Sequence, residues 1–457
     1  MTDKIKSFKE YINGKEITVI GIGISNTPLI RFLLKHGAIV TACDKKNKDE
    51  IGEIANELIS LGVTLKLGQD YLKNIKADIV FKTPGMRYDT PELLALRDKG
   101  TVVTSEMEEF MKICPAKIYA VTGSDGKTTT TTLIHTLLKE EGYKCHIGGN
   151  IGAPLLDKID EIKESDIVVL ELSSFQLHTI KTSPHVAVIT NLSPNHLDWH
   201  KDYEEYIDAK KSIMLYQGKN DILVTNLSNK DSEPIGKAAK GIWRGFSSNC
   251  DAFVSLDGDY ICIGGEKYLN ISDIKIPGHH NIENYMAALA ATYPVVSKET
   301  AQKVAREFGG VPHRIELVRT LDGVRYYNSS IDSSPNRTIN TLRVFSEPVI
   351  LIAGGKDKGI SYDEIGAPIL EKAKALILIG KTADLIEKAV KDAEKLSSGA
   401  KHLPIYRRET YEEVVALAKS LSRGGDVVLL SNASTSFDMF KNFEERGNHF
   451  KKLVNNL

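Results

Sequence analysis

The sequence predicts an α/β protein with three domains, each built around a mostly parallel sheet. Short apolar runs with strand character alternate with amphipathic helical patterns along most of the chain, as expected when helices cover a parallel sheet. Several of these runs end in glycine-rich turns, where open α/β sheets bind ligands. The length of 457 residues fits about three domains of ordinary size.

Residues 1–114 are predicted to form a Rossmann-like domain. A helix is expected at 28–36, and strands are expected at 17–20, 38–42 and 78–81. The glycine-rich turn after the first strand favours a nucleotide ligand. One alternative is a nicotinamide dinucleotide with Asp44 on a ribose hydroxyl, but Asn26 replaces the third glycine of that fingerprint. Another nucleotide diphosphate, or a turn without a ligand, would need the same glycines.

Residues 115–312 are predicted to form a mononucleotide-binding domain with a phosphate-binding P-loop. An apolar strand at 118–121 leads into the turn Gly123–Gly126, and Lys127 and five threonines then open an amphipathic helix. The N–H groups of such a turn attract phosphate, Lys127 can reach its terminal groups, and the hydroxyl of Thr128 suits Mg²⁺. The loop, GxxGKTT, is shorter than the usual P-loop, and the alternative is a strand-to-helix turn with a chance lysine.

Two further strands of the central domain end in polar residues. Glu171 follows the strand at 166–170, and His196 lies shortly after the strand at 185–190. The carboxyl ends of parallel strands meet at one edge of the sheet, so we expect both residues to converge on the phosphate loop and to bind magnesium. Taken alone, each would also fit a solvated strand end or a loop histidine with satisfied hydrogen bonds.

Lys210 lies in a helix predicted at 202–216. It shares a face with Tyr206 and Met214, which the pattern predicts to be partly buried. A lysine on an inward face usually extends its amine back to water. A hairpin is expected later in this domain, at 260–269.

Residues 313–457 are predicted to form a second Rossmann-like domain. Its strands are expected at 349–353, 375–379 and 426–430. Their polar ends do not indicate a particular ligand from composition alone. The stretches 110–115 and 309–314 are interpreted as hinges between the three domains.

Composition and charge argue against several classes of function. The net charge is −1, so no overall field favours nucleic acid or an anionic membrane, and no apolar run has the length of a membrane-spanning helix. The five cysteines are an odd number without metal-type spacing, which favours a reducing compartment. The N-terminus lacks the apolar segment of a secretory signal. We therefore expect a cytoplasmic protein without nucleic-acid or membrane partners. We also expect it to be a monomer that acts on small molecules.

Several motifs together resemble the Mur ligase family. These motifs are TGSDGKTT at 122–129, GNIG at 149–152, ELSSFQL at 171–177, NHLD at 195–198 and PHR at 312–314. The closing run SFDMFKNFEERG at 436–447 is similar to that of the members that add D-glutamate. The resemblance covers all three domains and implies an amide ligase of peptidoglycan precursor synthesis. ATP would phosphorylate the carboxylate of UDP-N-acetylmuramoyl-L-alanine, and the amine of D-glutamate would attack the acyl phosphate.

The resemblance also implies roles for matching positions. Those for ATP are Gly123, Ser124, Asp125, Gly126, Lys127, Thr128, Thr129, Asn281, Asn284 and Arg314. Those for two Mg²⁺ ions are Thr128, Glu171, His196 and Lys210. Those for the UDP-linked substrate are Gly23, Ser25, Asn26, Asp44, Lys45, Thr83, Pro84, Gly85, Asn150, Ser173 and Gln176. Those for D-glutamate are Ser333, Lys358, Ser436 and Phe443.

Three of these residues, Lys127, His196 and Lys210, would be catalytic. Lys210 falls where the family carries a carbamylated lysine, and a carbamate turns the cationic amine into an anionic ligand for magnesium. One stretch departs from the family pattern: many members have NDSKATN where this chain has NSSIDSS at 328–334. The aspartate that would contact the nucleotide is Ser329 here, and Asp332 is a candidate to replace it.

Three other functions fit parts of the pattern. A related ligase, such as a folylpolyglutamate synthase or another Mur ligase, would share the central domain but not the closing run. A nicotinamide-dependent oxidoreductase would leave Lys127 without a use. A non-catalytic nucleotide-binding regulator would tolerate the loss of Lys210.

Overall fold

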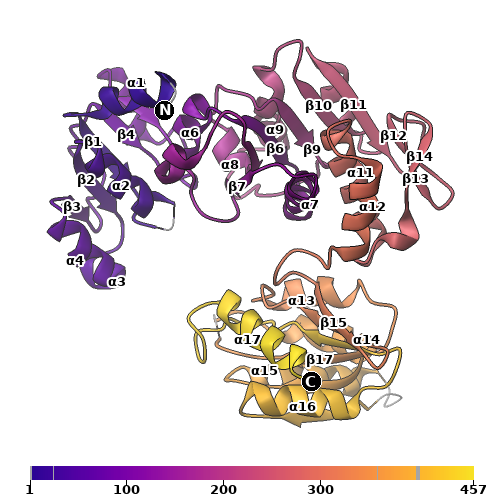
Figure 1. Cartoon of the computed structure of the whole chain (residues 1–457). Helices are drawn as coiled ribbons and strands as arrows, with labels where there is room; N and C mark the ends of the chain where they lie inside the picture. Colours follow the sequence, from indigo (N-terminus) through magenta and orange to yellow (C-terminus); the bar gives the residue numbers. More distant parts are fainter. Residues whose placement is uncertain (1–2, 24, 358, 398–401) are drawn as a thin grey trace. The chain divides into compact units, whose positions relative to one another are not determined.

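The computed structural model describes residues 3–23, 25–357, 359–397 and 402–457. Within these residues the chain forms two compact units: unit 1 extends to Ile271 and includes residues 282–304, and unit 2 comprises residues 272–281 and 305–457. Unit 1 contains two sheets and unit 2 contains one (Figure 1). Among the described residues, no helix is both long enough and apolar enough to cross a membrane.

The first sheet of unit 1 has five parallel strands in the order β3-β2-β1-β4-β5. Its elements are α1 (Asp3–Ile12), β1 (Glu16–Ile20), α2 (Asn26–Lys35), β2 (Ile39–Asp44), α3 (Lys48–Ile51), α4 (Glu53–Ser60), β3 (Thr64–Leu67), β4 (Ile79–Phe81), α5 (Pro91–Asp98), β5 (Val102–Thr104) and α6 (Glu106–Ile113). Side chains of β1 alternate between the faces: Val19 packs in the cluster that contains α2, and Ile20 in the cluster that contains α5. The strand order is that of a Rossmann fold, which confirms the prediction.

The second sheet of unit 1 has nine strands in the order β14-β13-β12-β11-β10-β9-β6-β8-β7. Pairing is parallel from β12 to β7, and β12, β13 and β14 form antiparallel hairpins, the second at the place predicted. The strands are β6 (Lys117–Thr122), β7 (Cys145–Gly149), β8 (Ile167–Glu171), β9 (Val186–Ile189), β10 (Ile222–Asn226), β11 (Ile242–Ser247), β12 (Val254–Asp257), β13 (Tyr260–Ile263) and β14 (Glu266–Asn270). The helices are α7 (Lys127–Glu140), η1 (Leu156–Glu161), α8 (Ser174–Leu177), α9 (Tyr203–Leu215), α10 (Glu233–Lys237), η2 (Ile271–Asp273), α11 (His279–Thr292) and α12 (Lys298–Glu307).

Unit 2 contains a six-stranded sheet in the order β15-β16-β20-β17-β18-β19, parallel except for the β15–β16 pair. Its elements are β15 (Glu316–Leu321), β16 (Val324–Asn328), α13 (Pro335–Leu342), β17 (Val349–Ala353), η3 (Asp363–Ile365), α14 (Gly366–Lys372), β18 (Ala373–Leu378), α15 (Ala383–Leu396), β19 (Ile405–Arg407), α16 (Tyr411–Leu421), β20 (Val427–Leu430) and α17 (Phe443–Asn455). Along β17, Leu351 faces the core that contains α13, α14 and α15, whereas Ile352 faces the core that contains α16 and α17. Helices therefore cover both faces, as predicted.

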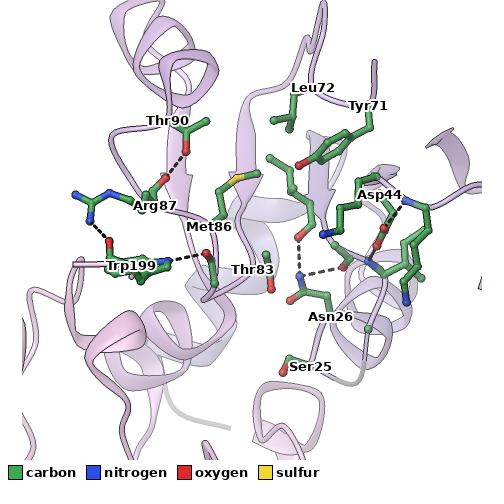
Figure 2. A pocket seen from close by; sticks show the side chains of 17 residues that line it. Ser25, Asn26, Asp44, Tyr71, Leu72, Thr83, Met86, Arg87, Thr90 and Trp199 are labelled. Atoms are coloured by element: carbon green, nitrogen blue, oxygen red, sulfur yellow. Dashed lines mark hydrogen bonds between the residues drawn. The ribbon is translucent and has the colours of Figure 1, made fainter. Parts of the chain in front are cut away.

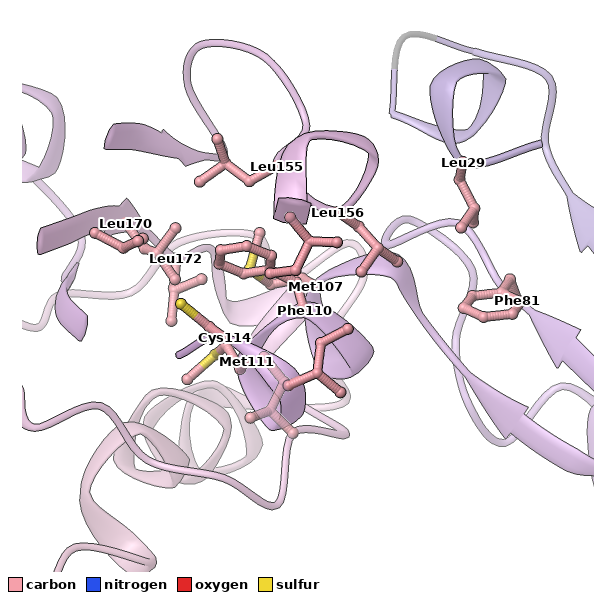
Figure 3. Close-up of a cluster of buried hydrophobic side chains, with 14 of the residues drawn as sticks. Leu29, Phe81, Met107, Phe110, Met111, Cys114, Leu155, Leu156, Leu170 and Leu172 are labelled. Atoms are coloured by element: carbon pink, nitrogen blue, oxygen red, sulfur yellow. The ribbon is translucent and has the colours of Figure 1, made fainter. Parts of the chain in front are cut away.

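The stretch 110–115 is not a hinge, contrary to the interpretation from the sequence. Its first four residues end α6, and Phe110 is fully buried. Phe110 belongs to one hydrophobic cluster that also contains Phe81 of the first sheet and Leu170 of the second (Figure 3). The two sheets of unit 1 therefore share a continuous core. The domain boundaries at 114/115 and 312/313 stay a prediction.

We expect Phe110→Ala to destabilise both sheets of unit 1 together. Removing a buried aromatic ring costs about 3–5 kcal/mol of unfolding free energy, because its contacts and its transfer energy are lost. Urea unfolding with hydrogen exchange of each sheet measures the effect. The control is Ile54→Ala on α4, whose side chain is 39% exposed and should matter by about 0.5 kcal/mol or less. Separate unfolding of residues 15–105 in Phe110→Ala, with the second sheet intact, would contradict the shared core.

Candidate active site

The phosphate loop joins β6 to α7 at the carboxyl edge of the second sheet. Gly123 has φ 149°, and a Cβ at this position would lie 1.9 Å from Thr190 Oγ1. Gly126 has φ 76°, and a Cβ there would lie 2.3 Å from Asn284 Oδ1. Both positions therefore require glycine. Gly126 is also the N-cap of α7 and, as a glycine, supplies no side-chain cap to the N–H groups at the helix N-terminus.

Hydrogen bonds hold the loop in one shape. Ser124 Oγ lies 2.8 Å from the Tyr206 hydroxyl and donates to Ser193 O at 3.0 Å. Lys127 Nζ donates to Gly123 O at 2.9 Å and to Ser124 O at 2.8 Å, so the cation lies directly over the loop. The loop and the positive end of the helix form a preorganised anion site.

Glu171 ends β8, the strand next to β6, and is almost completely buried. Its Oε1 accepts a hydrogen bond from Asn150 Nδ2 at 2.9 Å. Its Oε2 is also buried and has no hydrogen-bond partner within the part of the chain that the structure describes. A buried carboxylate oxygen without a hydrogen-bond partner destabilises the folded protein. A divalent cation that prefers hard oxygen ligands would satisfy this oxygen.

Lys210 points inward from α9, as the helical pattern predicted, and its amine does not extend to water. The residue is 2% exposed, Nζ donates to Thr122 Oγ1 at 3.2 Å, and Nζ lies 4.8 Å from the centre of the Tyr206 ring. Burial, and then the nearby Lys127 cation, lower the pKa of Lys210 well below its ordinary value. The site therefore favours a neutral amine.

His196 lies in the loop after β9 with φ 54°, and its ring packs against Phe175 at 4.9 Å between ring centres. Partial burial is the main cause that lowers the pKa of His196, which favours the neutral imidazole that binds metals. Glu171 ends β8 on one side of β6, and His196 follows β9 on the other side, so both residues lie at the carboxyl edge where the phosphate loop begins.

A cavity of about 750 Å³ lies at the carboxyl edge of the first sheet (Figure 2). Seven of the residues predicted for the UDP-linked substrate line it: Gly23, Ser25, Asn26, Asp44, Lys45, Thr83 and Gly85. Pro84 and Gln176 instead line a smaller neighbouring cavity, which shares Ser25 and Asn26 with the first. Together the two cavities are therefore lined by predicted substrate contacts next to the first sheet and by Gln176 of α8, next to the second sheet.

Asn26 and Asp44 hold the turn at the mouth of this cavity. Asn26 Nδ2 donates to Ile20 O at 2.9 Å and to Gly21 O at 3.1 Å, which explains an asparagine at the third fingerprint position. Asp44 Oδ2 accepts from Ile22 N at 2.7 Å, and Oδ1 accepts from Lys46 N at 2.9 Å. Both side chains thus carry structural hydrogen bonds in addition to lining the cavity.

Several residues of the cavity wall were not predicted from the sequence. Tyr71, Met86, Arg87, Thr90 and Trp199 all line it. Trp199 directly follows the NHLD motif, and Arg87 follows the expected turn 83–85 by two residues, so proximity to a motif was the available signal. Ser173 and Gln176, which were predicted as substrate contacts, form the capping box that starts α8.

The remaining predicted residues divide between the units. Asn284 is in unit 1, where its Oδ1 accepts from Thr130 Oγ1 at 3.2 Å. In unit 2, Asn281 Nδ2 donates to Pro277 O at 2.6 Å, and Arg314 is exposed. Phe443 begins α17 after the N-cap Asn442, and Ser436 is buried. Ser333 is partly buried, and Lys358 lies outside the described residues.

Asp332 is not available to replace the acid that is missing at Ser329. Its carboxylate is buried inside unit 2, where Oδ2 accepts hydrogen bonds from Thr341 Oγ1 and Ser431 Oγ, both at 2.8 Å. Burial also raises the pKa of Asp332. The sequence pattern could not reveal Ser431 as a partner of Asp332, because the two residues are 99 positions apart in the chain.

The fold and the site define an α/β protein with a P-loop and a buried carboxylate at its edge. Family models match the chain as "Mur ligase MurD-like, N-terminal domain" at residues 15–105, "Mur ligase middle domain" at 121–292 and "Mur ligase, glutamate ligase domain" at 313–433. The chain belongs to the Mur ligase family.

Relatives extend over the whole chain. The UDP-N-acetylmuramoylalanine–D-glutamate ligase of Ruminiclostridium cellulolyticum is 53% identical over 464 residues and covers 100% of both chains. The enzyme of the same name from Clostridium perfringens is 50% identical over 462 residues, again with 100% of both chains covered. The structure of UDP-N-acetylmuramate–alanine ligase from Thermotoga maritima matches with a TM-score of 0.57 and 20% identity over 97% of this chain and 99% of that chain, which shows the fold alone.

Glu106 is a buried acid in the wall of the smaller cavity. Its Oε1 accepts a hydrogen bond from Leu156 N at 3.0 Å. Burial raises the pKa of Glu106 from its ordinary value of 4.5 to about 7, so the folded protein keeps a proton that the unfolded chain loses. The stability from this group is therefore present below pH 4.5 and lost as the pH rises to 7.

We expect Glu106→Gln to remove this pH dependence, because glutamine resembles the protonated acid. The variant should match the wild type near pH 4.5 and be more stable above pH 7, by on the order of 3 kcal/mol for the full shift. Urea unfolding across this pH range measures the difference. Glu53→Gln, an exposed change on α4, is the control and should change little at any pH. A constant difference for Glu106→Gln at every pH would contradict the assignment.

Proposed function

We propose that this protein joins D-glutamate to UDP-N-acetylmuramoyl-L-alanine, with ATP converted to ADP and phosphate, in peptidoglycan precursor synthesis. The observation that carries the proposal is the grouping of a phosphate loop, the unpartnered oxygen of Glu171 and the buried amine of Lys210 at one sheet edge. The grouping occurs in a chain 53% identical, over its whole length, to a relative named for this reaction.

ATP is assigned to the phosphate loop. The loop N–H groups and the N-terminus of α7 would bind its phosphates, and Lys127 would stabilise the charge that spreads over the transferring phosphoryl group. A carboxylate oxygen of the UDP-linked substrate attacks the γ-phosphorus, and ADP leaves. The amine of D-glutamate then attacks the acyl carbon, phosphate leaves, and the amine loses a proton. Asn281, Asn284 and Arg314 are assigned to the rest of the nucleotide.

Magnesium is assigned to two positions at the same edge. Thr128 and Glu171 would hold the first ion, and His196 and Lys210 the second. The buried Glu171 Oε2 without a partner and the neutral His196 ring fit this assignment. Bound Mg²⁺ would neutralise phosphate charge during the transfer.

Lys210 is assigned as a carbamate. A neutral amine is the form that attacks CO₂: the nitrogen–carbon bond forms, the nitrogen loses a proton, and a carbamate anion results. The lowered pKa of Lys210 and the nearby Lys127 cation both support this step, because they favour the amine before it and the anion after it. The carbamate would then supply an anionic oxygen ligand.

The substrates are assigned to separate parts of the chain. The UDP end fits the cavity of about 750 Å³, and the muramoyl end would extend to Asn150, Ser173 and Gln176. The assignment of D-glutamate to Ser333, Lys358, Ser436 and Phe443 is supported by the buried Ser436 hydroxyl and by the N–H groups that begin α17. We also propose the three domains 1–114, 115–312 and 313–457, a cytoplasmic location and a monomeric state.

We expect Lys210→Ala to be folded but nearly inactive, and short carboxylates such as acetate to restore part of the rate. The added anion would occupy the place of the carbamate oxygens. Phosphate release measures activity, and circular dichroism measures folding. Lys211→Ala, the neighbouring and less buried lysine of α9, should stay active. Full activity of Lys210→Ala would contradict the role, and inactivity without rescue would contradict the carbamate.

We expect D-glutamate to be used in strong preference to L-glutamate, L-alanine, L-lysine or diaminopimelate. A ligand that leaves the buried donors of a site without their matching acceptor is used less efficiently, by a factor of about 10² or more. Phosphate release with UDP-N-acetylmuramoyl-L-alanine, ATP and each amino acid tests this, with Lys127→Ala as the inactive control. Equal or faster turnover with another amino acid would overturn the substrate assignment but leave an ATP-dependent ligase.

A further inference from the structure

We propose that Arg87 is a positioning residue that fixes the loop of His196 and the start of α9 against the wall of the UDP cavity. The proposal rests on the proposed function and adds a residue that was not among the predicted site residues. Arg87 lies in the loop after β4, within the wall of the cavity of about 750 Å³.

The guanidinium of Arg87 uses all five of its N–H donors. Two bonds join Nε and Nη2 to Asp89 Oδ1 and Oδ2, at 2.8 and 2.9 Å. Two more join Nη2 and Nη1 to Glu205 Oε1 and Oε2, at 2.8 and 3.0 Å. The fifth joins Nη1 to Trp199 O at 2.7 Å, and the group also stacks on the Trp199 ring, 4.9 Å from its centre (Figure 2).

The arrangement requires an arginine. A planar fork with five donors reaches two carboxylates and a carbonyl at once, whereas a lysine offers three donors on a single nitrogen. The side chains of Arg87 and Glu205 are only 21% and 17% exposed, so the pair is largely removed from water. The bonds from Arg87 are also the main reason that the pKa of Glu205 is lowered to about 2, which keeps the carboxylate charged.

The partners of Arg87 belong to the segment that carries the predicted metal ligands. The backbone N–H groups of Trp199 and His200 both donate to His196 O, at 3.0 Å, so this part of the loop is one turn. Glu205 lies in the first turn of α9, the helix that carries Lys210. The Trp199 side chain also binds the cavity wall: its Nε1 donates a hydrogen bond to Gly85 O at 2.8 Å (Figure 2).

Helix α8 packs on the same segment from the other side. The Phe175 ring lies 4.9 Å from His196 and 4.7 Å from Trp199, measured between ring centres. His200 Nε2 lies 2.9 Å from Ser174 Oγ. Because α8 and Arg87 both hold the segment 196–205, a change in the cavity wall at Arg87 changes how His196 and Lys210 are held. Occupation of the UDP cavity should therefore order the metal-binding edge.

Hydrogen exchange with UDP alone, without ATP or Mg²⁺, tests this coupling. In the wild type, UDP should slow exchange in the segment 20–26, whose residues 20–23, 25 and 26 line the cavity, and also at 203–212 of α9, which do not. In Arg87→Lys, which keeps the charge but loses the fork, protection of 20–26 should remain and that of 203–212 should disappear. Equal protection of 203–212 in both proteins would overturn the proposal, and so would a lack of protection at 20–26 in the wild type.

Kinetics provide the second measurement. Arg87→Lys should lower kcat by about tenfold and raise the half-saturating Mg²⁺ concentration, while KM for the UDP-linked substrate changes by less than about threefold. The matched control is Arg31→Lys, which alters another bidentate pair, with Glu57 at 2.8 and 3.0 Å, away from the cavity. It should leave all three parameters unchanged. An unchanged kcat in Arg87→Lys would overturn the proposal.

A double variant separates positioning from folding. Arg87→Met with Glu205→Gln removes both charges of the Arg87–Glu205 pair, and Asp89, the other carboxylate partner of Arg87, keeps Lys201 Nζ at 3.7 Å. It should fold with a thermal midpoint near that of the wild type and show the same low kcat as Arg87→Lys. Wild-type kcat and Mg²⁺ dependence in the double variant would overturn the proposal, even where Arg87→Lys does not fold. An inactive wild type would refute the proposed function, while the exchange experiment would still decide the role of Arg87.

Discussion

The parallel pairing of β6 between β8 and β9 is the constraint on which the site depends. Its register places Val121 beside Glu171 and Thr122 beside Ile189, so the three strands end at the same level. The phosphate loop, the buried carboxylate and the loop of His196 all begin there. A slip of one residue would turn Glu171 to the opposite face of the sheet. Backbone hydrogen bonds thus determine which side chains can meet, before any ligand is present.

Electrostatics at this edge follow from the same geometry. Lys127 and Lys210 lie near each other and near the carboxylate of Glu171. A positive charge on both lysines is unfavourable there, because Lys210 and Glu171 are buried. The structure resolves the conflict at Lys210, whose pKa is lowered by burial and by Lys127. A neutral amine ends the repulsion between the lysines. Within the described residues, Glu171 Oε2 is also buried without a hydrogen-bond partner, and a divalent cation would satisfy this oxygen.

Much of the fold and part of the site could be predicted from the sequence, because their signals are local. The alternation of strands and helices, the glycines of the phosphate loop and the strand-end position of Glu171 all depend on neighbours along the chain. The errors involve distant partners. The apolar residues around Phe110 resembled a hinge because the sheets they join are separate in sequence. The Arg87–Glu205 pair spans 118 residues, and no pattern in either segment indicates the other.

The two compact units divide the proposed chemistry in a way that the packing explains. The phosphate loop and the UDP cavity belong to unit 1, where one hydrophobic cluster runs from α2 through α6 to β8. Rigid packing transmits small displacements, so the spacing of these two sites is fixed by a shared core rather than by a flexible connection. The residues assigned to D-glutamate lie in unit 2, which has its own core on each face of its sheet. The residues assigned to the phosphates and to magnesium therefore lie in one compact unit, whereas the residues assigned to D-glutamate lie in a second unit that folds around separate packing.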